Sequence, residues 1–183
     1  LLRGIYRSNY YQFFKDAFKV LEPETKLVDN WHIEYICNIL QEEVKRIERG
    51  EPKTSDIIIN IPPRSLKSML VTIIFNAWVW IRSPHIKFIT TSYSESLSTD
   101  HTMSTRRLIL SPWYQDLFGD LYNLDYDLNT KTNFKNNKGG IRWSAGVGGS
   151  NLGRGADIII CDDPLKVKDA YSELARKSAV DWW

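Results

Sequence analysis

Apolar residues recur at helical spacing along residues 1–50 of the chain. An aromatic-rich stretch from Ile5 to Leu21 predicts one amphipathic helix. A second apolar stripe predicts another helix, which Gly50 can cap. The members of this stripe are Ile33, Ile36, Cys37, Leu40, Val44 and Ile47. Residues 1–50 are therefore expected to form N-terminal helices.

The rest of the chain alternates between short β-branched runs and longer helical stretches. The strand-like runs are residues 57–61, 87–93, 141–145 and 158–162. The helical stretches are residues 67–81, residues 95–110 and a last helix from about residue 169. Such alternation predicts an α/β core over residues 51–183, with a mostly parallel central sheet and helices on both of its faces.

The run at residues 57–61 leads into a tight turn that ends in Lys67 and Ser68. A lysine ammonium there can neutralise the β- and γ-phosphates of a nucleotide, and the serine hydroxyl can ligate Mg²⁺. We expect the nucleotide to be bound by Pro63, Arg64, Ser65, Leu66, Lys67 and Ser68. The usual pattern has glycines where this chain has Ile61 and Leu66. Taken alone, these residues are explained equally well by a helix start with a solvated lysine.

A second motif follows roughly a hundred residues later, where the apolar run at residues 158–162 ends in Asp162 and Asp163. In an ATPase with such a pair, the first acid holds Mg²⁺ and the second orients and deprotonates the attacking water. The alternative is an ordinary turn, because Asp favours turn starts and Pro164 stops a strand. The two motifs together favour a magnesium-dependent ATP hydrolase.

Further segments lie before, between and beyond these motifs. They are Trp31-His32, Phe88–Tyr93, Gly148–Asp157, Ala170–Ser172 and Asp181-Trp182. In this order, with the turn at residues 61–68 and the strand end at residues 162–164, they resemble the large terminase subunit of tailed bacteriophages, the motor that packages DNA into procapsids. The resemblance covers most of residues 30–183.

The resemblance implies a P-loop NTPase fold of the ASCE/RecA-like class that uses ATP and Mg²⁺. It implies double-stranded DNA, the portal protein and the terminase small subunit as partners. It also implies a homo-oligomeric ring, of five subunits, in the host cell cytoplasm and transiently at the portal vertex of the viral procapsid. The resemblance implies that the chain stops before the coupling motif and the nuclease domain of a full-length large subunit. We therefore expect a single ATPase domain over residues 1–183 without nuclease activity.

The resemblance also suggests roles for two arginines and for one helix start. Arg64 would touch phosphate within its own subunit, whereas Arg154, between two glycines, would reach the site of a neighbouring subunit. A surface side chain in a glycine turn is the alternative for Arg154. Trp31 and His32 would contact adenine, although His32 stands where such enzymes often have Gln. A tryptophan before an apolar stripe is otherwise a hydrophobic staple.

Composition narrows the choice of function class only slightly. A chain of 183 residues that is 43% hydrophobic can bury one sizeable core. The apolar stretch from Met69 to Ile81 is interrupted by Thr72 and Asn76 and is too short to span a bilayer, so we expect no membrane association. Two alternatives to a packaging motor stay open: a helicase-like DNA-dependent ATPase, and a degenerate P-loop module that binds nucleotide without useful turnover.

Charge does not by itself indicate a nucleic-acid partner, because the net charge is only +2. The most basic polar stretch, residues 129–140, is typical of a hairpin or a mobile loop. Lys131, Lys135 and Lys138 in this stretch are either solvated or in contact with DNA phosphates.

Overall fold

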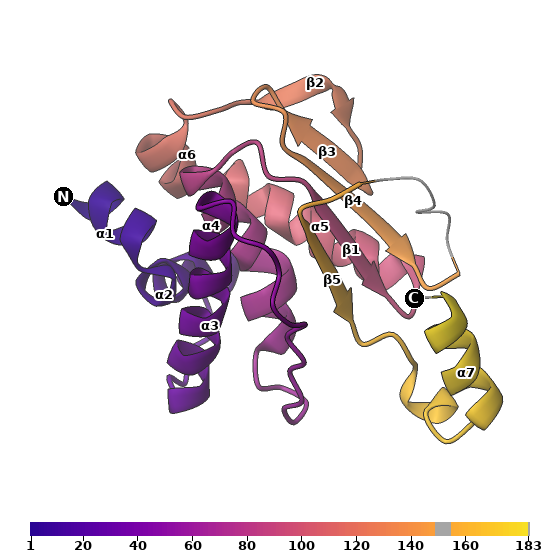
Figure 1. Cartoon of the computed structure of the whole chain (residues 1–183). Helices are drawn as coiled ribbons and strands as arrows, with labels where there is room; N and C mark the ends of the chain where they lie inside the picture. Colours follow the sequence, from indigo (N-terminus) through magenta and orange to yellow (C-terminus); the bar gives the residue numbers. More distant parts are fainter. Residues whose placement is uncertain (149–154, 183) are drawn as a thin grey trace. The chain divides into compact units, whose positions relative to one another are not determined.

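The computed structural model describes residues 1–148 and 155–182, which form two compact units (Figure 1). Unit 1 comprises Leu1–Pro84 and Thr105–Leu121, and unit 2 comprises His85–Ser104 and Tyr122–Trp183. Each unit is therefore assembled from two separate stretches of sequence. Helix α5 (Glu95–Ile109) contributes its first part to unit 2 and its last part to unit 1.

Unit 1 is helical. Besides the end of α5 it contains α1 (Leu2–Ser8), α2 (Tyr10–Leu21), α3 (Trp31–Glu48), the π-helical turn η1 (Met69–Ile73), α4 (Ile74–Arg82) and α6 (Pro112–Phe118). The helix predicted by the second apolar stripe is confirmed as α3. The prediction of one helix from Ile5 to Leu21 is wrong, because Asn9 is extended and its side chain accepts a hydrogen bond from the backbone N–H of Gln12 at 2.9 Å. Asn9 therefore caps a new helix.

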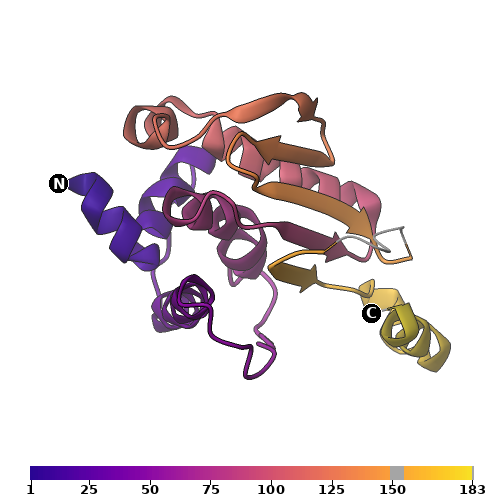
Figure 2. The same ribbon diagram turned by 45° about the horizontal axis from the view of Figure 1, so that its top comes forward.

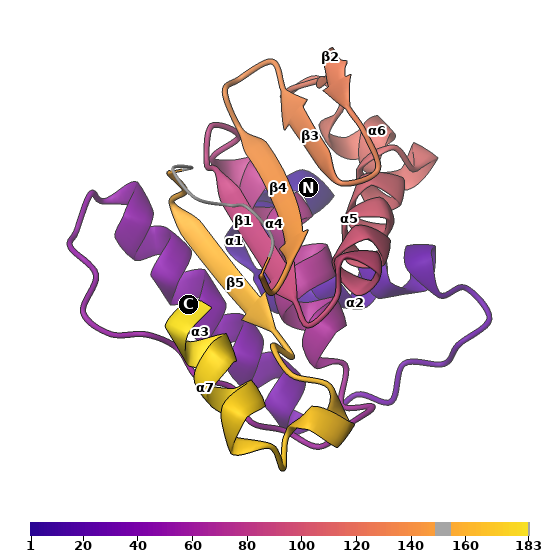
Figure 3. The same cartoon turned by 90° about the vertical axis from the view of Figure 1, so that its right-hand side faces the viewer.

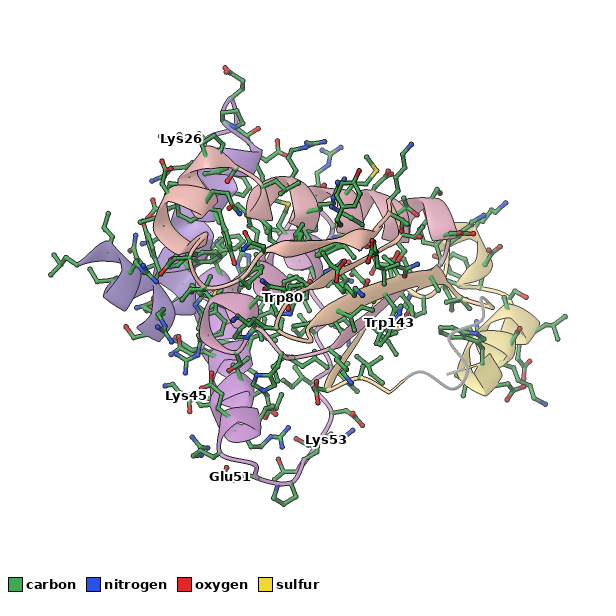
Figure 4. The ribbon with its side chains drawn as sticks, turned by 90° about the horizontal axis from the view of Figure 1, so that it is seen from above. Lys26, Lys45, Glu51, Lys53, Trp80 and Trp143 are labelled. Atoms are coloured by element: carbon green, nitrogen blue, oxygen red, sulfur yellow. The ribbon has the colours of Figure 1, made fainter. Side chains whose placement is uncertain are left out.

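Aromatic side chains fill the core of unit 1. Phe13, Phe14 and Trp80 are fully buried, and Figure 4 shows Trp80 inside the unit while Glu51 and Lys53 project from the loop after α3. Trp78 satisfies its indole N–H by donating to the Tyr6 carbonyl oxygen at 2.7 Å. Each such side chain stabilises the fold by roughly 1.5–3 kcal/mol through burial.

The strand predicted at residues 57–61 does not form, so this prediction is wrong. Residues 51–62 have no regular structure, and Ile57 and Ile58 are 40% and 82% exposed. A β-branched run becomes a strand only where a neighbouring strand pairs with it. The prolines at 62 and 63 also lack the N–H that a ladder needs.

Unit 2 is built on a sheet with strand order β2-β3-β4-β1-β5 (Figure 3). The strands are β1 (Phe88–Ser92), β2 (Leu124–Asn129), β3 (Asn133–Asn136), β4 (Ile141–Gly146) and β5 (Ile158–Asp162). β1 pairs in parallel with β4 and β5, whereas β2, β3 and β4 pair antiparallel. The prediction of a mostly parallel sheet is wrong, because the turns at residues 130–132 and 137–140 are too short for a parallel crossover.

One face of this sheet is buried under the first part of α5, which lies behind the strands in Figure 2. Thr90 and Ser92 on β1 and Arg142 on β4 point to this face and are buried. Ser98 of α5 donates its hydroxyl to the Thr90 carbonyl oxygen at 3.2 Å. The face is therefore unusually polar for a sheet interior.

Helix α7 (Glu173–Trp182) follows β5 after a short 3-10 turn, η2 (Val167–Asp169), and carries no buried residue. Among the described helices, none combines the length and the apolar character that crossing a bilayer requires.

Candidate functional site

The predicted phosphate loop has an uncommon backbone. Arg64 and Leu66 adopt φ angles of 64° and 63°, the left-handed region that favours glycine. Leu66 is the position at which the usual P-loop pattern has its second glycine. Each such residue costs about 1–3 kcal/mol and persists only where the surrounding structure imposes it. Alternation of left-handed and other residues turns successive backbone N–H groups towards a common centre, which suits an anion.

The helix after this loop begins as predicted. The Leu70 N–H donates to the Leu66 carbonyl oxygen at 2.9 Å, so helical hydrogen bonding starts where the loop ends. Lys67 and Ser68 form the first turn and are partly exposed. The chain then passes through the π-helical turn η1, a rare feature that is frequent at functional sites. Leu70 is fully buried, and its carbonyl oxygen accepts a hydrogen bond from the Tyr10 hydroxyl, which fixes this turn to α2.

The start of α3 lies against the same loop. His32 Nε2 is 3.2 Å from the Ser65 carbonyl oxygen, so the imidazole holds the loop from the side. Trp31 is 75% exposed and its ring centroid is 6.2 Å from that of Tyr35. The structure therefore brings His32 beside the predicted phosphate loop within unit 1, and Trp31 precedes it at the start of α3.

The two predicted carboxylates of unit 2 have different environments. Asp162 ends β5 opposite Ser92, is 4% exposed and lies 3.8 Å from His101 Nδ1. Burial lowers the pKa of His101 more than the charge of Asp162 raises it, so the imidazole is neutral at neutral pH and the contact is not an ion pair. Asp163 is exposed, has a φ of 49°, and accepts a hydrogen bond from the Tyr93 N–H on its carbonyl oxygen at 3.0 Å.

Sequence reasoning missed a buried arginine in the sheet of unit 2. Arg142 is fully buried on β4, and its Nε donates to Thr102 Oγ1 at 3.2 Å. Burial lowers the pKa of its guanidinium to about 9. The signal was the alternation along β4, which puts Arg142 on the same face as Ser144 and Gly146.

The structure also reveals a cavity of 390 Å³ beside Asp163. Its other lining residues are Tyr93, Leu165, Lys166, Ala170 and Tyr171. A second cavity of 250 Å³ shares Tyr93, Leu165 and Lys166 with the first and reaches α7. Sequence reasoning missed Lys166 as a cavity residue, although it follows the carboxyl end of a strand, where ligands of open α/β sheets bind.

The predicted site residues fall into two groups. The phosphate loop, Trp31 and His32 belong to unit 1, and Asp162 and Asp163 belong to unit 2. Ser68 in unit 1 and Asp162 in unit 2 each carry an oxygen of the kind that Mg²⁺ prefers. The described residues contain no cluster of three or more His, Cys, Asp or Glu that could hold a metal by itself. Arg154 lies outside the described residues.

Of the two predictions for residues 129–140, the structure shows the hairpin: the stretch contains the end of β2, the turn after it and β3, and β2 and β3 pair antiparallel. Lys135 pairs with Asp125 at 3.1 Å, whereas Lys131 and Lys138 are exposed. Comparison of the chain with protein-family models, curated proteins and solved structures gives no match.

Proposed function

We propose that this chain is the P-loop ATPase motor domain of a large terminase subunit, which hydrolyses ATP to drive double-stranded DNA into a procapsid. In this proposal it acts in a homo-oligomeric ring with the portal protein and the terminase small subunit.

One observation carries the proposal. Among the described residues, the non-glycine residues with positive φ are Arg64, Leu66 and Asp163. All three were singled out from the sequence as nucleotide-binding or catalytic positions. Strained backbone gathers at ligand sites, where the rest of the fold offsets its cost. Its coincidence with these positions favours a nucleotide site over an ordinary helix start and an ordinary turn.

The side chains have complementary roles in this reaction. Lys67 neutralises the β- and γ-phosphates, and the loop amides donate to their oxygens. Ser68 and Asp162 would hold Mg²⁺, which neutralises phosphate charge when it is bound. Asp163 is exposed and orients the attacking water. Arg64 offers a further cation from within the loop.

The deciding experiment measures ATP binding and hydrolysis in the presence of Mg²⁺. Lys67→Ala should lower ATP affinity by roughly a hundredfold, because a charged contact to phosphate is lost. Lys26→Ala, at an exposed lysine away from the loop, is the matched control and should bind like the wild type. Equal affinity in the wild type and Lys67→Ala would remove the phosphate-loop assignment.

The same measurement separates the two alternatives. Hydrolysis that rises with double-stranded DNA supports a packaging motor, whereas stimulation by single strands alone favours a helicase-like ATPase. Tight ATP binding without turnover under any of these conditions would point to a degenerate nucleotide-binding module.

A further inference from the structure

The cavity beside Asp163 lies where two neighbouring parallel strands end. Tyr93 directly follows β1, Asp163 directly follows β5, and the hydrogen bond between their backbones joins the two ends. Figure 1 shows η2 and α7 continuing from the end of β5. We call the cavity formed by Tyr93, Asp163, Leu165, Lys166, Ala170 and Tyr171 the β1–β5 cleft.

The topology marks this position as a ligand site. From β1 the chain goes through α5 to β2, β3 and β4 on one side, and then crosses to β5 on the other side. In open sheets, ligands bind outside the carboxyl ends of strands where the chain changes direction in this way. The cleft occupies that position within unit 2 and has a volume of 390 Å³.

The lining combines three kinds of chemistry. Lys166 Nζ lies 5.6 Å from the centroid of the Tyr93 ring, which orients the ammonium on an aromatic face. Tyr171 is 89% exposed and offers a second ring. The carboxylate of Asp163 lies at the same cleft, and Asp169 lines the adjoining cavity. A bare anion would be opposed by these two acids, so the lining suits a ligand that also carries apolar faces and hydrogen-bond donors.

A nucleotide unit of a polymer has this combination of groups. Its phosphate is an anion for Lys166, and its sugar or base gives a flat surface for tyrosine rings. A free small molecule needs a pocket that encloses most of its surface, whereas the cleft is open at Tyr171. An open cleft is suited to a polymer that passes along it.

We propose that the β1–β5 cleft binds a nucleotide unit of DNA, with its phosphate at Lys166 and its sugar or base against Tyr93 and Tyr171. The choice of DNA as the polymer rests on the proposed function. Because Asp163 lines the same cleft, occupation of the cleft by DNA would reach the carboxylate assigned to water activation. Lys166, Tyr93 and Tyr171 would thus be residues through which the motor contacts DNA.

The test is the binding of a fluorescent DNA to the whole chain, measured by anisotropy at several salt concentrations without ATP. Lys166→Gln should weaken binding several-fold and reduce the slope of log affinity against log salt by about 1, as expected for one lost phosphate contact. The matched control is Lys168→Gln, which removes the same charge two residues later at an exposed position outside the lining. Its DNA affinity should exceed that of Lys166→Gln.

Single-stranded and double-stranded probes distinguish how the backbone is held. Tyr171→Ala should weaken single-strand binding by roughly fivefold to a hundredfold if an unpaired base stacks on the ring. Equal weakening of both probes would assign Tyr171 to the sugar and phosphate. Either result supports the cleft as the DNA site.

Two results would overturn the inference. One is an unchanged affinity and salt slope in Lys166→Gln. The other is a Lys166→Gln variant that loses ATP affinity and keeps DNA affinity, which would assign the ammonium to the nucleotide. Lys67→Ala, measured in the same assays, tests the ATP site separately, so failure of the cleft and failure of the ATPase proposal give different patterns.

Discussion

Leu66 holds a backbone conformation that a branched side chain tolerates poorly, at a φ of 63°. Leu66→Gly should change the free energy of unfolding little, because relief of this strain offsets the greater entropy of the unfolded chain. Leu66→Val should destabilise by about 1–2 kcal/mol, since a β-branched residue fits the left-handed region worst. Urea denaturation of both variants, together with ATP binding, measures these effects. The same loss of stability in both variants would show that strain at this position is irrelevant.

The neighbouring carboxylates Asp162 and Asp163 should respond differently to neutralisation. Asp163→Asn should keep stability and ATP binding, because the side chain is exposed, while hydrolysis falls at least about a hundredfold through loss of the proposed general base. Asp162→Asn alters a side chain that is 4% exposed, so it should lower stability as well as activity. Thermal unfolding and steady-state hydrolysis separate the two. An Asp163→Asn enzyme that hydrolyses ATP normally would contradict the assignment of this carboxylate.

At the level of helices, one ion pair joins α3 to α4 in unit 1. Arg82 Nε donates to Glu48 at 3.0 Å, its Nη2 contacts the second carboxylate oxygen, and Ser83 donates to the same carboxylate at 2.9 Å. Burial acts to raise the pKa of Glu48, but the hydrogen bonds from Arg82 and Ser83 outweigh it, so the pKa lies below 4.5. The carboxylate is therefore more stable as an anion in the folded chain than in the unfolded chain.

The lowered pKa of Glu48 makes the stability of the fold depend on pH. A lowered carboxyl pKa stabilises the fold above pH 4.5, and this contribution is lost as the pH falls through the folded value. Glu48→Gln should therefore cost about 1 kcal/mol at neutral pH, after solvent screening is allowed for, and nothing in strong acid. Urea denaturation of the wild type and of Glu48→Gln, from strong acid to neutral pH, measures this difference in stability. Glu42→Gln, at an exposed pair with Lys45, should show no such difference at either pH.

Two isoleucines test which apolar run forms a core strand. Ile58 is 82% exposed in the irregular segment, whereas Ile160 is 7% exposed on β5. Ile58→Ala should change the free energy of unfolding by less than about 0.5 kcal/mol, and Ile160→Ala should lower it by about 2–5 kcal/mol. Urea denaturation measures both. A large loss in Ile58→Ala would mean that residues 57–61 are packed in solution.

Local patterns predicted the helices better than the sheet. The segments that form α3 and α5 each contain apolar residues at helical spacing. Each helix can therefore be predicted without knowledge of the elements that pack against it. The fate of residues 57–61 depended on pairing with a strand elsewhere in the chain, which spacing does not encode. For residues 129–140 the sequence left a hairpin and a mobile loop open, and the antiparallel pairing of β2, β3 and β4 that a hairpin implies was not included in the predicted sheet.

The candidate site residues differ in the same way: some are recognisable from a local motif, and others are brought together only by the fold. Leu66 and Asp163 could be picked out because their motifs are contiguous in sequence, and their backbones are strained at those positions. Lys166 and Tyr93 lie on one cleft only because β1 and β5 are neighbours, although Tyr93 is far from Lys166 in sequence. His32 was predicted to contact adenine, which stays a prediction, and the structure adds a contact with the Ser65 carbonyl oxygen that its sequence position did not reveal.

If one chain binds both ATP and DNA, the two affinities must be coupled reciprocally. The factor by which saturating ATP changes DNA affinity has to equal the factor by which saturating DNA changes ATP affinity. We expect a factor of roughly 5 to 150 in favour of joint binding. The Asp163→Asn variant allows both titrations, because it should bind ATP without hydrolysing it. Adding Lys166→Gln to this variant should bring the coupling factor towards unity. Coupling of full size in that double variant would place the DNA contact that controls hydrolysis outside the β1–β5 cleft.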